Sequence, residues 1–496
     1  MIGLMLRRFR RFLRPAQLCV GFALCVLAGP TSAGPLGLPG PQPAPILNNT
    51  TDRVGDTLGR VGDAVDTTTG KVGGVVGGVT GTVGDTLGTA TDTVGGTLQT
   101  VTGAVGNTLN GVTGAVGDTL DQTLSGVKRD LAGRPFVPNA LEKDAQGQRV
   151  VAGRVLALSP SDRALSAARS LNFEIVSDEQ LSPLGLKLVV LRSPLGMNAI
   201  DAVSALRAVD PQGSYDFAHI YDPSGETVAA PGGGLPNVVA ANEAKIGIID
   251  AGIDKSHPAF RDADITTKAT VKNGAHALPT AHGTAVASLL VGDDGQFRGV
   301  LPGAELYAAD AFGGSATGGA ADDIVRALAW LAEKNVPVIN ISITGPKNAL
   351  LEAAIRAAIA HGHIIVAAAG NDGPAAPVKY PAAYDGVVAV TSVDAKHKVQ
   401  LDANRGPQIA FAARGVDVRV AQPGAKYGAV TGTSFASPLV AGRFAELMPN
   451  VDVVAAEHAR RALKAEAISP TGSRDAVYGF GILELRSTSA AATAAK

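Results

Sequence analysis

The clearest candidate for a reactive group is Ser434, within the stretch 432–438 (GTSFASP). An apolar run follows at 439–442, so the stretch predicts a turn that opens a helix. Such a turn exposes the hydroxyl and directs unpaired backbone N–H groups at the group that the oxygen attacks. A serine hydroxyl is a poor nucleophile at neutral pH, so Ser434 needs a base and a group that fixes the tautomer of that base.

Candidate partners lie upstream of the serine. Asp250 ends the short β-branched run 245–250 (KIGIID), which predicts a buried parallel strand whose carboxyl end carries the carboxylate. His282 stands at the start of an apolar helix expected at 283–291. Asn371 follows another apolar strand, and its side-chain amide can donate to an oxyanion.

Each of these residues has a simpler interpretation when it is taken alone. Ser434 could be a helix N-cap. Asp250, His282 and Asn371 could be polar residues of turns at the ends of strands and helices. The presence of all four in one chain makes these interpretations much weaker, so we take the residues as one candidate catalytic group.

With the chain order Asp, His, Ser, these motifs make residues 243–485 resemble the subtilisin family of serine proteases. The resemblance implies that Ser434 is the nucleophile, His282 the general base and Asp250 its orienting partner. Asn371 would stabilise the oxyanion together with the backbone N–H of Ser434. By the same resemblance, the substrate-binding residues are Ser342, Ile343, Thr344 and Gly345 on an edge strand, with Ala368, Ala369 and Gly370 as the opposite wall of the primary pocket.

Two positions depart from the family pattern. Thr344 stands where the family usually has glycine, and its side chain could narrow the pocket toward small substrate residues. Ala251 stands where the family commonly has serine or threonine. One hydrogen bond near Asp250 is therefore expected to be lost, while activity is expected to remain.

The chemistry implied by the resemblance uses no cofactor and no catalytic metal. Family members often hold structural calcium, and 293–295 (DDG) could do so, but a solvated turn is the favoured interpretation. His257 is expected to brace a loop. His361 and His363 are taken as structural.

The chain of 496 residues is 46% hydrophobic and has a net charge of −1. The length allows two or three domains, and the charge offers no long-range attraction to nucleic acid, so no nucleic-acid partner is expected. Over 243–485, apolar strands alternate with amphipathic helices, which predicts an α/β fold with a mostly parallel, doubly wound sheet, similar to that of subtilisin. The carboxyl ends of the strands would bring Asp250, Asn371 and the loop before Ser434 together.

Residues 1–33 contain five arginines, followed by an apolar core and by small residues that end at Ala33. This pattern predicts a secretory signal peptide and a location that is secreted, periplasmic or in the cell envelope. A retained membrane anchor is the alternative, but the apolar core is shorter than the roughly 20 residues that a spanning helix needs. Both cysteines, Cys19 and Cys25, lie in this segment, so the mature protein would contain no disulfide.

Residues 34–130 are of low complexity, with a Pro-rich stretch before an 11-residue repeat of Gly, Thr, Val, Asp and Leu over 54–126. A period of 11, about 3.67 residues per turn, keeps apolar residues on one stripe of a helix. The many glycines disfavour a helix by about 1 kcal/mol each. Two interpretations stay open: a flexible spacer, or an amphipathic helix that contacts a membrane or envelope surface.

Residues 148–224 show the order strand, helix, strand, strand, helix, strand, which predicts a small ferredoxin-like α+β domain. Its place before the catalytic region resembles that of the family's propeptide, an intramolecular chaperone and inhibitor. Residues 225–242 are interpreted as a linker, and 486–496 as an Ala/Ser/Thr tail. Self-processing is expected to fall between Tyr221 and Asn242.

The sequence thus predicts an exported serine endopeptidase that hydrolyses polypeptides through an acyl-enzyme intermediate and is made as a precursor inhibited by its own propeptide. The alternative is an envelope or surface-binding protein that keeps an inactive protease fold and works through the repeat. The complete set of Asp250, His282 and Ser434 favours the enzyme.

Overall fold

The computed structural model describes residues 141–228, 233–235, 244–272, 278–315 and 318–485. The expected signal peptide, the repeat, most of the linker and the tail lie outside these residues. All described residues belong to one compact unit. Within them, no helix combines the length and the apolar character that a membrane span requires.

The first part of this unit has the βαββαβ order expected for 148–224. Its elements are β1 (Leu141–Lys143), β2 (Arg149–Leu158), α4 (Asp162–Ser170), β3 (Glu174–Leu181), the 3₁₀ helix η1 (Ser182–Leu184), β4 (Leu186–Arg192), α5 (Ala199–Val209) and β5 (Ser214–Pro223). The strands form an antiparallel sheet in the order β5-β2-β4-β3, with β1 paired to β2. Both helices begin at side-chain caps, Ser161 and Asn198, which satisfy N–H groups that a helix start leaves unpaired.

The second part is built on a sheet whose strands all run parallel. The strands are β7 (Lys245–Asp250), β8 (Ile265–Ala269), β9 (Glu305–Asp310), β11 (Val338–Ile341), β13 (Ile364–Ala368), β14 (Val388–Val393) and β15 (Ile409–Arg414). Their order in the sheet is β15-β14-β13-β11-β7-β9-β8. The expected parallel α/β sheet is therefore confirmed, and Asp250 ends one of its inner strands.

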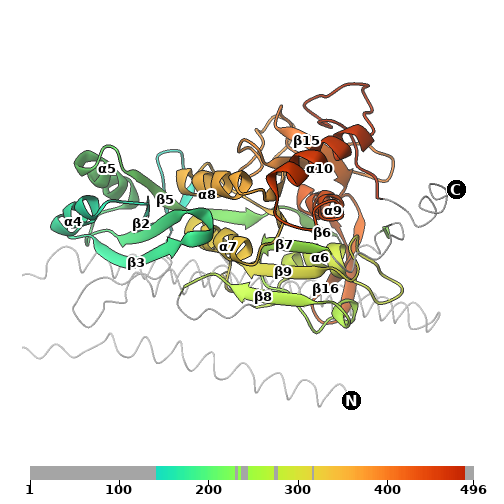
Figure 1. Cartoon of the computed structure of the whole chain (residues 1–496), viewed down its shortest axis with the longest axis horizontal. Coiled ribbons are helices and arrows are strands. Elements are labelled where there is room, and N and C mark those ends of the chain that lie inside the picture. Colours follow the sequence, from blue (N-terminus) through green and yellow to red (C-terminus); the bar gives the residue numbers. More distant parts are fainter. Residues whose placement is uncertain (1–140, 229–232, 236–243, 273–277, 316–317, 486–496) are drawn as a thin grey trace, which may run out of the picture. The chain divides into compact units, whose positions relative to one another are not determined.

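Helices cover both faces of this sheet (Figure 1). They are α6 (Ala281–Val291), α7 (Ala321–Glu333), α8 (Ala349–Ala360), α9 (Thr433–Ala445) and, packed on α9, α10 (Val453–Glu466). Ile246 and Ile248 of β7 share a core with α6 and α9, whereas Ile249 shares a second core with α7 and α8. Because successive side chains of a strand face opposite sides, the side chain of Asp250 lies on the face of α6 and α9.

The antiparallel sheet of the first part also has two apolar faces. Val155 and Val189 point into a core that is shared with α4 and α5. Leu156, Leu188 and Val190 point to the opposite face, where they join the core of α7 and α8. One face therefore holds the small domain together, and the other attaches it to the parallel-sheet part.

Short elements complete the unit. They are η2 (Pro258–Phe260) and the strands β6 (Glu226–Val228), β10 (Gly319–Ala320), β12 (Ile343–Thr344), β16 (Val418–Gln422) and β17 (Lys426–Thr431). β10 and β12 pair with β5, and β6 pairs with β17. The chain that leaves the small domain is therefore held by strands of the second part.

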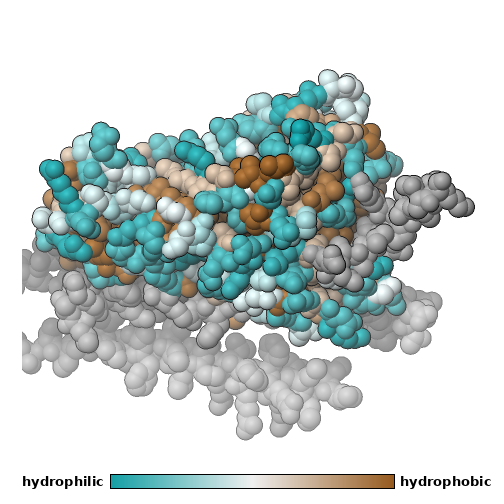
Figure 2. Space-filling model, in the orientation of Figure 1, coloured by the Kyte–Doolittle hydropathy of each residue, from teal (hydrophilic) through white to brown (hydrophobic). Residues whose placement is uncertain are grey.

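The face of the molecule in Figure 2 is mostly hydrophilic, with separate hydrophobic patches. Large apolar side chains that remain exposed belong to different elements and loops, for example Leu195, Leu401 and Val454. Scattered exposed apolar residues of this kind are normal for a folded protein.

Candidate active site

Asp250 and His282 are in direct contact. Nδ1 of His282, in the first turn of α6, lies 2.8 Å from Oδ1 of Asp250 at the end of β7. Asp250 is fully buried, and its Oδ1 also accepts a hydrogen bond of 2.7 Å from the N–H of Ala251. Because an ionised carboxylate only accepts, the imidazole must donate from Nδ1, which leaves Nε2 as an acceptor. This is the tautomer that a general base needs.

The close approach of α6 to the end of β7 depends on Gly283. A Cβ atom at this position would lie 2.2 Å from the carbonyl oxygen of Ala251, so any side chain would push the helix away from the strand. The helix start is fixed by Thr280, whose side chain accepts from the N–H of Gly283 at 3.1 Å. Backbone contacts thus set the position of His282 relative to Asp250.

The start of α9, which carries Ser434, packs against the ring of His282, but Ser434 and His282 are not hydrogen-bonded to each other. Ser434 is the second residue of α9, which starts after Gly432, and the ring centroid of the next residue, Phe435, lies 5.3 Å from that of His282. The Oγ atom of Ser434 instead donates to the carbonyl oxygen of Ser342 at 2.7 Å. Nε2 of His282 is buried and has no hydrogen-bond partner. The hydrogen bond expected between Ser434 and His282 is therefore absent in this structure.

The side chain of Asn371 is held in place from two sides. Its Oδ1 accepts from the N–H of Thr433 at 3.1 Å and from Nε2 of Gln400 at 3.4 Å. Its Nδ2 is thereby directed at Ser224, whose Oγ accepts a hydrogen bond of 2.8 Å. An amide donor that is fixed next to the helix of the nucleophile is suited to stabilising an oxyanion.

Residues 220–228 lie across the site as an added strand. Before the site, β5 pairs with β10 and with β12, where Pro223 stands opposite Ile343. After the site, β6 pairs with β17, where Glu226 stands opposite Thr431. All three pairings are antiparallel. The edge strand expected to bind substrate therefore accepts an added strand, which comes from this same chain.

The peptide bond between Ser224 and Gly225 passes the start of α9. A Cβ atom at Gly432 would lie 2.6 Å from Cα of Gly225 and 3.1 Å from the carbonyl oxygen of Ser224. A Cβ atom at Gly225 would lie 2.5 Å from the ring of Phe435. The two glycines allow the added strand to approach the backbone of residue 432 and the ring of Phe435, so the bond passes close to the start of the helix that carries Ser434.

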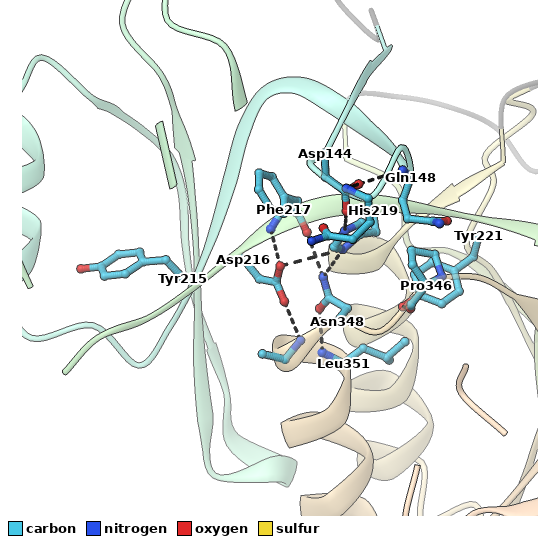
Figure 3. Close-up of polar contacts among 12 residues, drawn as sticks. Asp144, Gln148, Tyr215, Asp216, Phe217, His219, Tyr221, Pro346, Asn348 and Leu351 are labelled. Atoms are coloured by element: carbon cyan, nitrogen blue, oxygen red, sulfur yellow. Dashed lines mark hydrogen bonds and ion pairs between the residues drawn. The ribbon is translucent and has the colours of Figure 1, made fainter. Parts of the chain in front are cut away.

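Tyr221, three residues before Ser224, is fully buried in a pocket of the second part (Figure 3). Its hydroxyl donates to the carbonyl oxygen of Pro346 at 2.7 Å. A Cβ atom at Gly345 would lie 2.5 Å from the tyrosine ring, so the pocket has room for the ring only because residue 345 is glycine. Burial, with a smaller contribution from Tyr384, raises the pKa of Tyr221 well above its usual value, so the hydroxyl is a donor at neutral pH.

A polar network holds the same strand at the start of α8 (Figure 3). Asn348 caps this helix, and its Oδ1 accepts from the N–H of Leu351 at 3.0 Å. Its Nδ2 donates to the carbonyl oxygen of Phe217 at 2.9 Å and to Nδ1 of His219 at 3.0 Å. Nε2 of the buried His219 must then donate to Oδ2 of Asp144, 3.1 Å away. A single asparagine thus links the helix cap of one part to two residues of β5.

Ion pairs connect β3 of the small domain to the second part. Oε1 of Glu179 lies 3.0 Å from Nε of Arg326 on α7 and 2.8 Å from Nζ of Lys272. Burial acts to raise the pKa of Glu179, but the hydrogen bond from Lys272 and the charge of Arg326 outweigh it, and this pKa is lowered. Arg326 also pairs with Asp322 and Asp323 of its own helix. The small domain is therefore held by charge as well as by apolar surface.

The other residues predicted to bind substrate lie at two depths. Thr344 and Gly345 line a cavity of about 460 Å³ beside the added strand, together with Asn371. The predicted residues that are fully buried behind it are Ser342, Ile343, Ala368 and Ala369. Gly370 is also buried, and its N–H donates to Oγ1 of Thr433 at 3.1 Å. Only part of the predicted set is therefore open to a ligand while the added strand is in place.

His257 and the turn at 293–295, which were expected to have structural roles, make contacts of a structural kind. Nδ1 of His257 accepts from the N–H of Ala259, and its Nε2 lies 2.9 Å from the carbonyl oxygen of Lys426. Oδ1 of Asp294 accepts from the N–H groups of Gln296 and Phe297, as in a turn. Among the described residues, no group of three or more His, Cys, Asp or Glu side chains is arranged to hold a metal.

A parallel α/β sheet with an Asp–His pair at its carboxyl edge and a serine at the start of a neighbouring helix is an arrangement that serine hydrolases use, serine endopeptidases among them. Residues 241–481 match the subtilase family. Subtilisin DY of Bacillus licheniformis is 33% identical over 249 residues, which cover 49% of this chain and 89% of the relative. The major intracellular serine protease of Bacillus subtilis (strain 168) is 32% identical over 219 residues, or 42% of this chain and 69% of the relative.

A similar fold is found in fervidolysin from Fervidobacterium pennivorans, a keratinolytic enzyme related to subtilisin. The TM-score is 0.60 at 21% identity, over 72% of this chain and 64% of that chain. The chain belongs to the subtilase family, and it is a serine endopeptidase.

Proposed function

We propose that this chain is the exported precursor of a serine endopeptidase, which cuts its own Ser224–Gly225 bond and is inhibited by the small domain until that domain leaves. The observation that carries this proposal is the strand 220–228, which lies across the site and is paired on both sides of the bond. Membership of the subtilase family supports the hydrolytic reaction. The small side chain of Ser224 agrees with the narrow pocket expected from Thr344.

In this proposal Ser434 is the nucleophile. Its Oγ turns from its present acceptor toward Nε2 of His282, which takes the hydroxyl proton as Oγ bonds to the carbonyl carbon of Ser224. Asp250 keeps Nδ1 of the imidazole as a donor and stabilises the positive charge that forms. The backbone N–H of Ser434 and Nδ2 of Asn371 stabilise the negative oxygen, for which Nδ2 has to give up its bond to Ser224 Oγ.

The C–N bond between Ser224 and Gly225 then breaks, and His282 gives its proton to the nitrogen of Gly225. A water molecule that loses a proton to His282 attacks the ester carbon, the bond between this carbon and Oγ of Ser434 breaks, and His282 returns the proton to Oγ as the carboxyl group of Ser224 is released. The products are a small domain that ends at Ser224 and an enzyme that starts at Gly225.

The small domain is suited to remain as an inhibitor after the cut. Its carboxyl end is anchored by the buried Tyr221 and by the Asn348 network, neither of which includes the cut bond. Leu156 and Leu188, both fully buried against the core of α7 and α8, add apolar contact. Full burial of one such side chain contributes about 1.5–3 kcal/mol. Polypeptide substrates would bind where residues 220–225 now lie.

We also propose that the precursor is exported through residues 1–33, on the basis of their charge and apolar pattern. Deleting 1–33 should leave the protein in the cytoplasm, which cell fractionation would reveal. An unchanged distribution would remove the export proposal. A membrane or envelope contact of residues 54–126 stays a prediction from the 11-residue period.

The test of self-processing compares the full chain with its Ser434→Ala variant. The wild-type chain should yield a species whose N-terminus is Gly225, by N-terminal sequencing and intact mass, whereas the variant should remain uncut. Ser166→Ala, on the exposed side of α4, serves as a control and should be processed normally. Only a processed form with Ser434 should react with a fluorophosphonate probe. The same cut in the Ser434→Ala chain would show that another protease makes it.

A further inference from the structure

Two buried carboxylates stand side by side at the edge of the site, and only one has a role so far. Asp310 ends β9 as Asp250 ends β7, and the two residues are direct partners in the parallel pairing of these strands. Neighbouring strands lie about 4.8 Å apart, so partners on the same face are in contact range. Leu306 and Ala308 of β9 belong to the core of α6 and α9, which places Asp310 on the same face as Asp250.

Each carboxylate has one oxygen with partners and one without. Oδ1 of Asp310 accepts from the N–H groups of Phe312 and Gly313, both at 2.9 Å. Oδ1 of Asp250 accepts from Nδ1 of His282. The Oδ2 atoms of both carboxylates are buried and have no hydrogen-bond partner. If both groups were ionised, two like charges and two unpaired oxygens would be buried together, at a high cost in free energy.

We propose that Asp310 is a positioning residue for Asp250: a neutral carboxylic acid whose O–H is directed at Oδ2 of Asp250. One proton removes both the like-charge repulsion and the unpaired oxygens, because the O–H of Asp310 can donate a hydrogen bond that Oδ2 of Asp250 accepts. The proton is assigned to Asp310 because, in the proposed function, Asp250 has to be ionised to stabilise the positive charge that forms on His282. Ala251 has no hydroxyl that could serve Oδ2 in its place. The inference rests on the proposed function, in which Asp250 orients the general base.

The electrostatic surroundings agree with a neutral Asp310. Burial raises the pKa of its carboxyl, the two backbone N–H groups act in the opposite direction, and the charge of Asp250 adds to the rise, with a raised pKa as the net result. Only 3% of Asp310 is exposed, so water does little to stabilise an ionised form.

Other charges near this strand end are already paired. Oγ1 of Thr270 donates to the carbonyl oxygens of both Asp310 and Asp323, so α7 approaches here. Oδ1 of Asp323 is paired with Arg326 at 2.7 Å. β8, on the far side of β9, places the uncharged Ala269 opposite Asp310. The charged groups that matter for Asp310 are therefore Asp250 and the imidazole beyond it.

The test measures kcat and the pH dependence of kcat/KM for the processed enzyme on a peptide substrate, with Asp310→Asn and Asp310→Ala. Loss of the donor in Asp310→Ala should lower kcat by about 10- to 100-fold. Asp310→Asn keeps a neutral donor and should recover most of this loss. The acidic limb of kcat/KM should stay where it is in Asp310→Asn, because a neutral group replaces a neutral group.

Two outcomes would overturn the proposal. A shift of the acidic limb to lower pH by about one unit in Asp310→Asn would mean that a negative charge beside His282 had been removed. Equal losses in the Asn and Ala variants would mean that Asp310 only fills space or shapes the turn. Glu305→Gln, at the other end of β9, is the matched control and should change neither kcat nor the limb.

A second readout needs no catalysis. Infrared difference spectra between the Ser434→Ala precursor and the same precursor with Asp310→Asn should contain the C=O band of a protonated carboxylic acid. Carboxylate bands alone would overturn the proposal. Because this measurement uses an inactive chain, it separates failure of the inference from failure of the proposed function.

Discussion

The hydroxyl of Ser434 donates to the carbonyl oxygen of Ser342, while Nε2 of His282, which is proposed to accept from it, has no hydrogen-bond partner. The amide of Asn371 is also engaged elsewhere, because its Nδ2 donates to the side-chain oxygen of Ser224 and not to an oxyanion. Both groups have to exchange one hydrogen bond before the reaction can begin. In the precursor that we propose, the two groups are therefore not yet engaged in the contacts that the reaction requires.

Asn371→Ala should lower kcat by about 10²–10³, the size of the effect of removing the corresponding donor in a subtilisin. The reason is that Nδ2 stabilises charge that exists only in the transition state, so KM should change little. The measurement is steady-state hydrolysis of a peptide substrate by the processed enzyme.

A suitable control is Gln400→Ala, which removes the weaker contact to Oδ1 of Asn371 and leaves its contact to Thr433 in place. This variant should lose far less activity. Unchanged kcat in Asn371→Ala would exclude the amide as an oxyanion donor.

At this scale the sequence predicts residue types well and contacts poorly. Asp250 and His282 were identified because each stands at the end of a clear strand or helix, and their contact follows from the parallel sheet. The hydrogen bond of Ser434 depends on a side-chain rotamer, which no local pattern encodes. The neighbourhood of Asp250 and Asp310 depends on the register of two strands that are sixty positions apart in the chain, so it could not be predicted.

Among the elements, β3 and α7 show how the small domain depends on charge. Glu179 of β3 is ionised against Arg326 and Lys272, and its pKa lies below the ordinary value of 4.5. A group whose pKa is lowered on docking strengthens docking above its ordinary pKa, and this contribution is lost as pH falls through the lowered pKa. Docking of the small domain should therefore weaken below about pH 4.5.

We expect the processed complex to release activity faster as the pH is lowered from 5 to 3.5 (roughly the range set by the Glu179 carboxyl). Glu179→Gln should release activity faster at neutral pH and lose most of this dependence. The measurement is the rate at which peptidase activity appears after transfer to each pH, assayed after return to neutral pH.

Glu174→Gln is the control for this experiment, because Glu174 pairs with Arg192 inside the small domain. It should behave like the wild type. A Glu179→Gln complex with the same pH dependence as the wild type would show that another group governs release.

Elements with strong apolar patterns could be predicted, and weaker ones could not. The βαββαβ order of the small domain follows from alternating strands and two amphipathic helices. α10 was not predicted, and the structure shows why its signal is weak: only Ala456, Ala459 and Leu463 of this helix are buried. The hairpin of β16 and β17 had a usable signal, since Val418 and Val420 alternate with Arg419 before a turn that contains Gly424.

For the whole molecule, the central feature is that the two parts share one core. Leu156, Leu188 and Val190 of the small domain lie in the same apolar cluster as α7 and α8. The two parts should therefore unfold together in the uncut chain, because separating them exposes apolar surface on both.

In the Ser434→Ala precursor, we expect a single thermal transition of the folded part. Leu188→Ala in that precursor should cost about 2–5 kcal/mol at the shared core and produce an additional transition at lower temperature, as the small domain detaches first. Differential scanning calorimetry would measure this.

Leu195→Ala is the matched control, since Leu195 is 62% exposed on the same domain and its truncation should leave the scan unchanged. A single undivided transition at lower temperature in Leu188→Ala would contradict the expectation that the small domain detaches first.

Because both flanks of the Ser224–Gly225 bond are strand-paired, the proposed cut would free neither new end. The carboxyl end would stay paired with β12, and the amino end would stay paired with β17. A molecule that is chemically mature would thus remain latent. The time before the enzyme cleaves another polypeptide would then depend on how long the carboxyl end of the small domain stays in the site, and not on the rate of the cut.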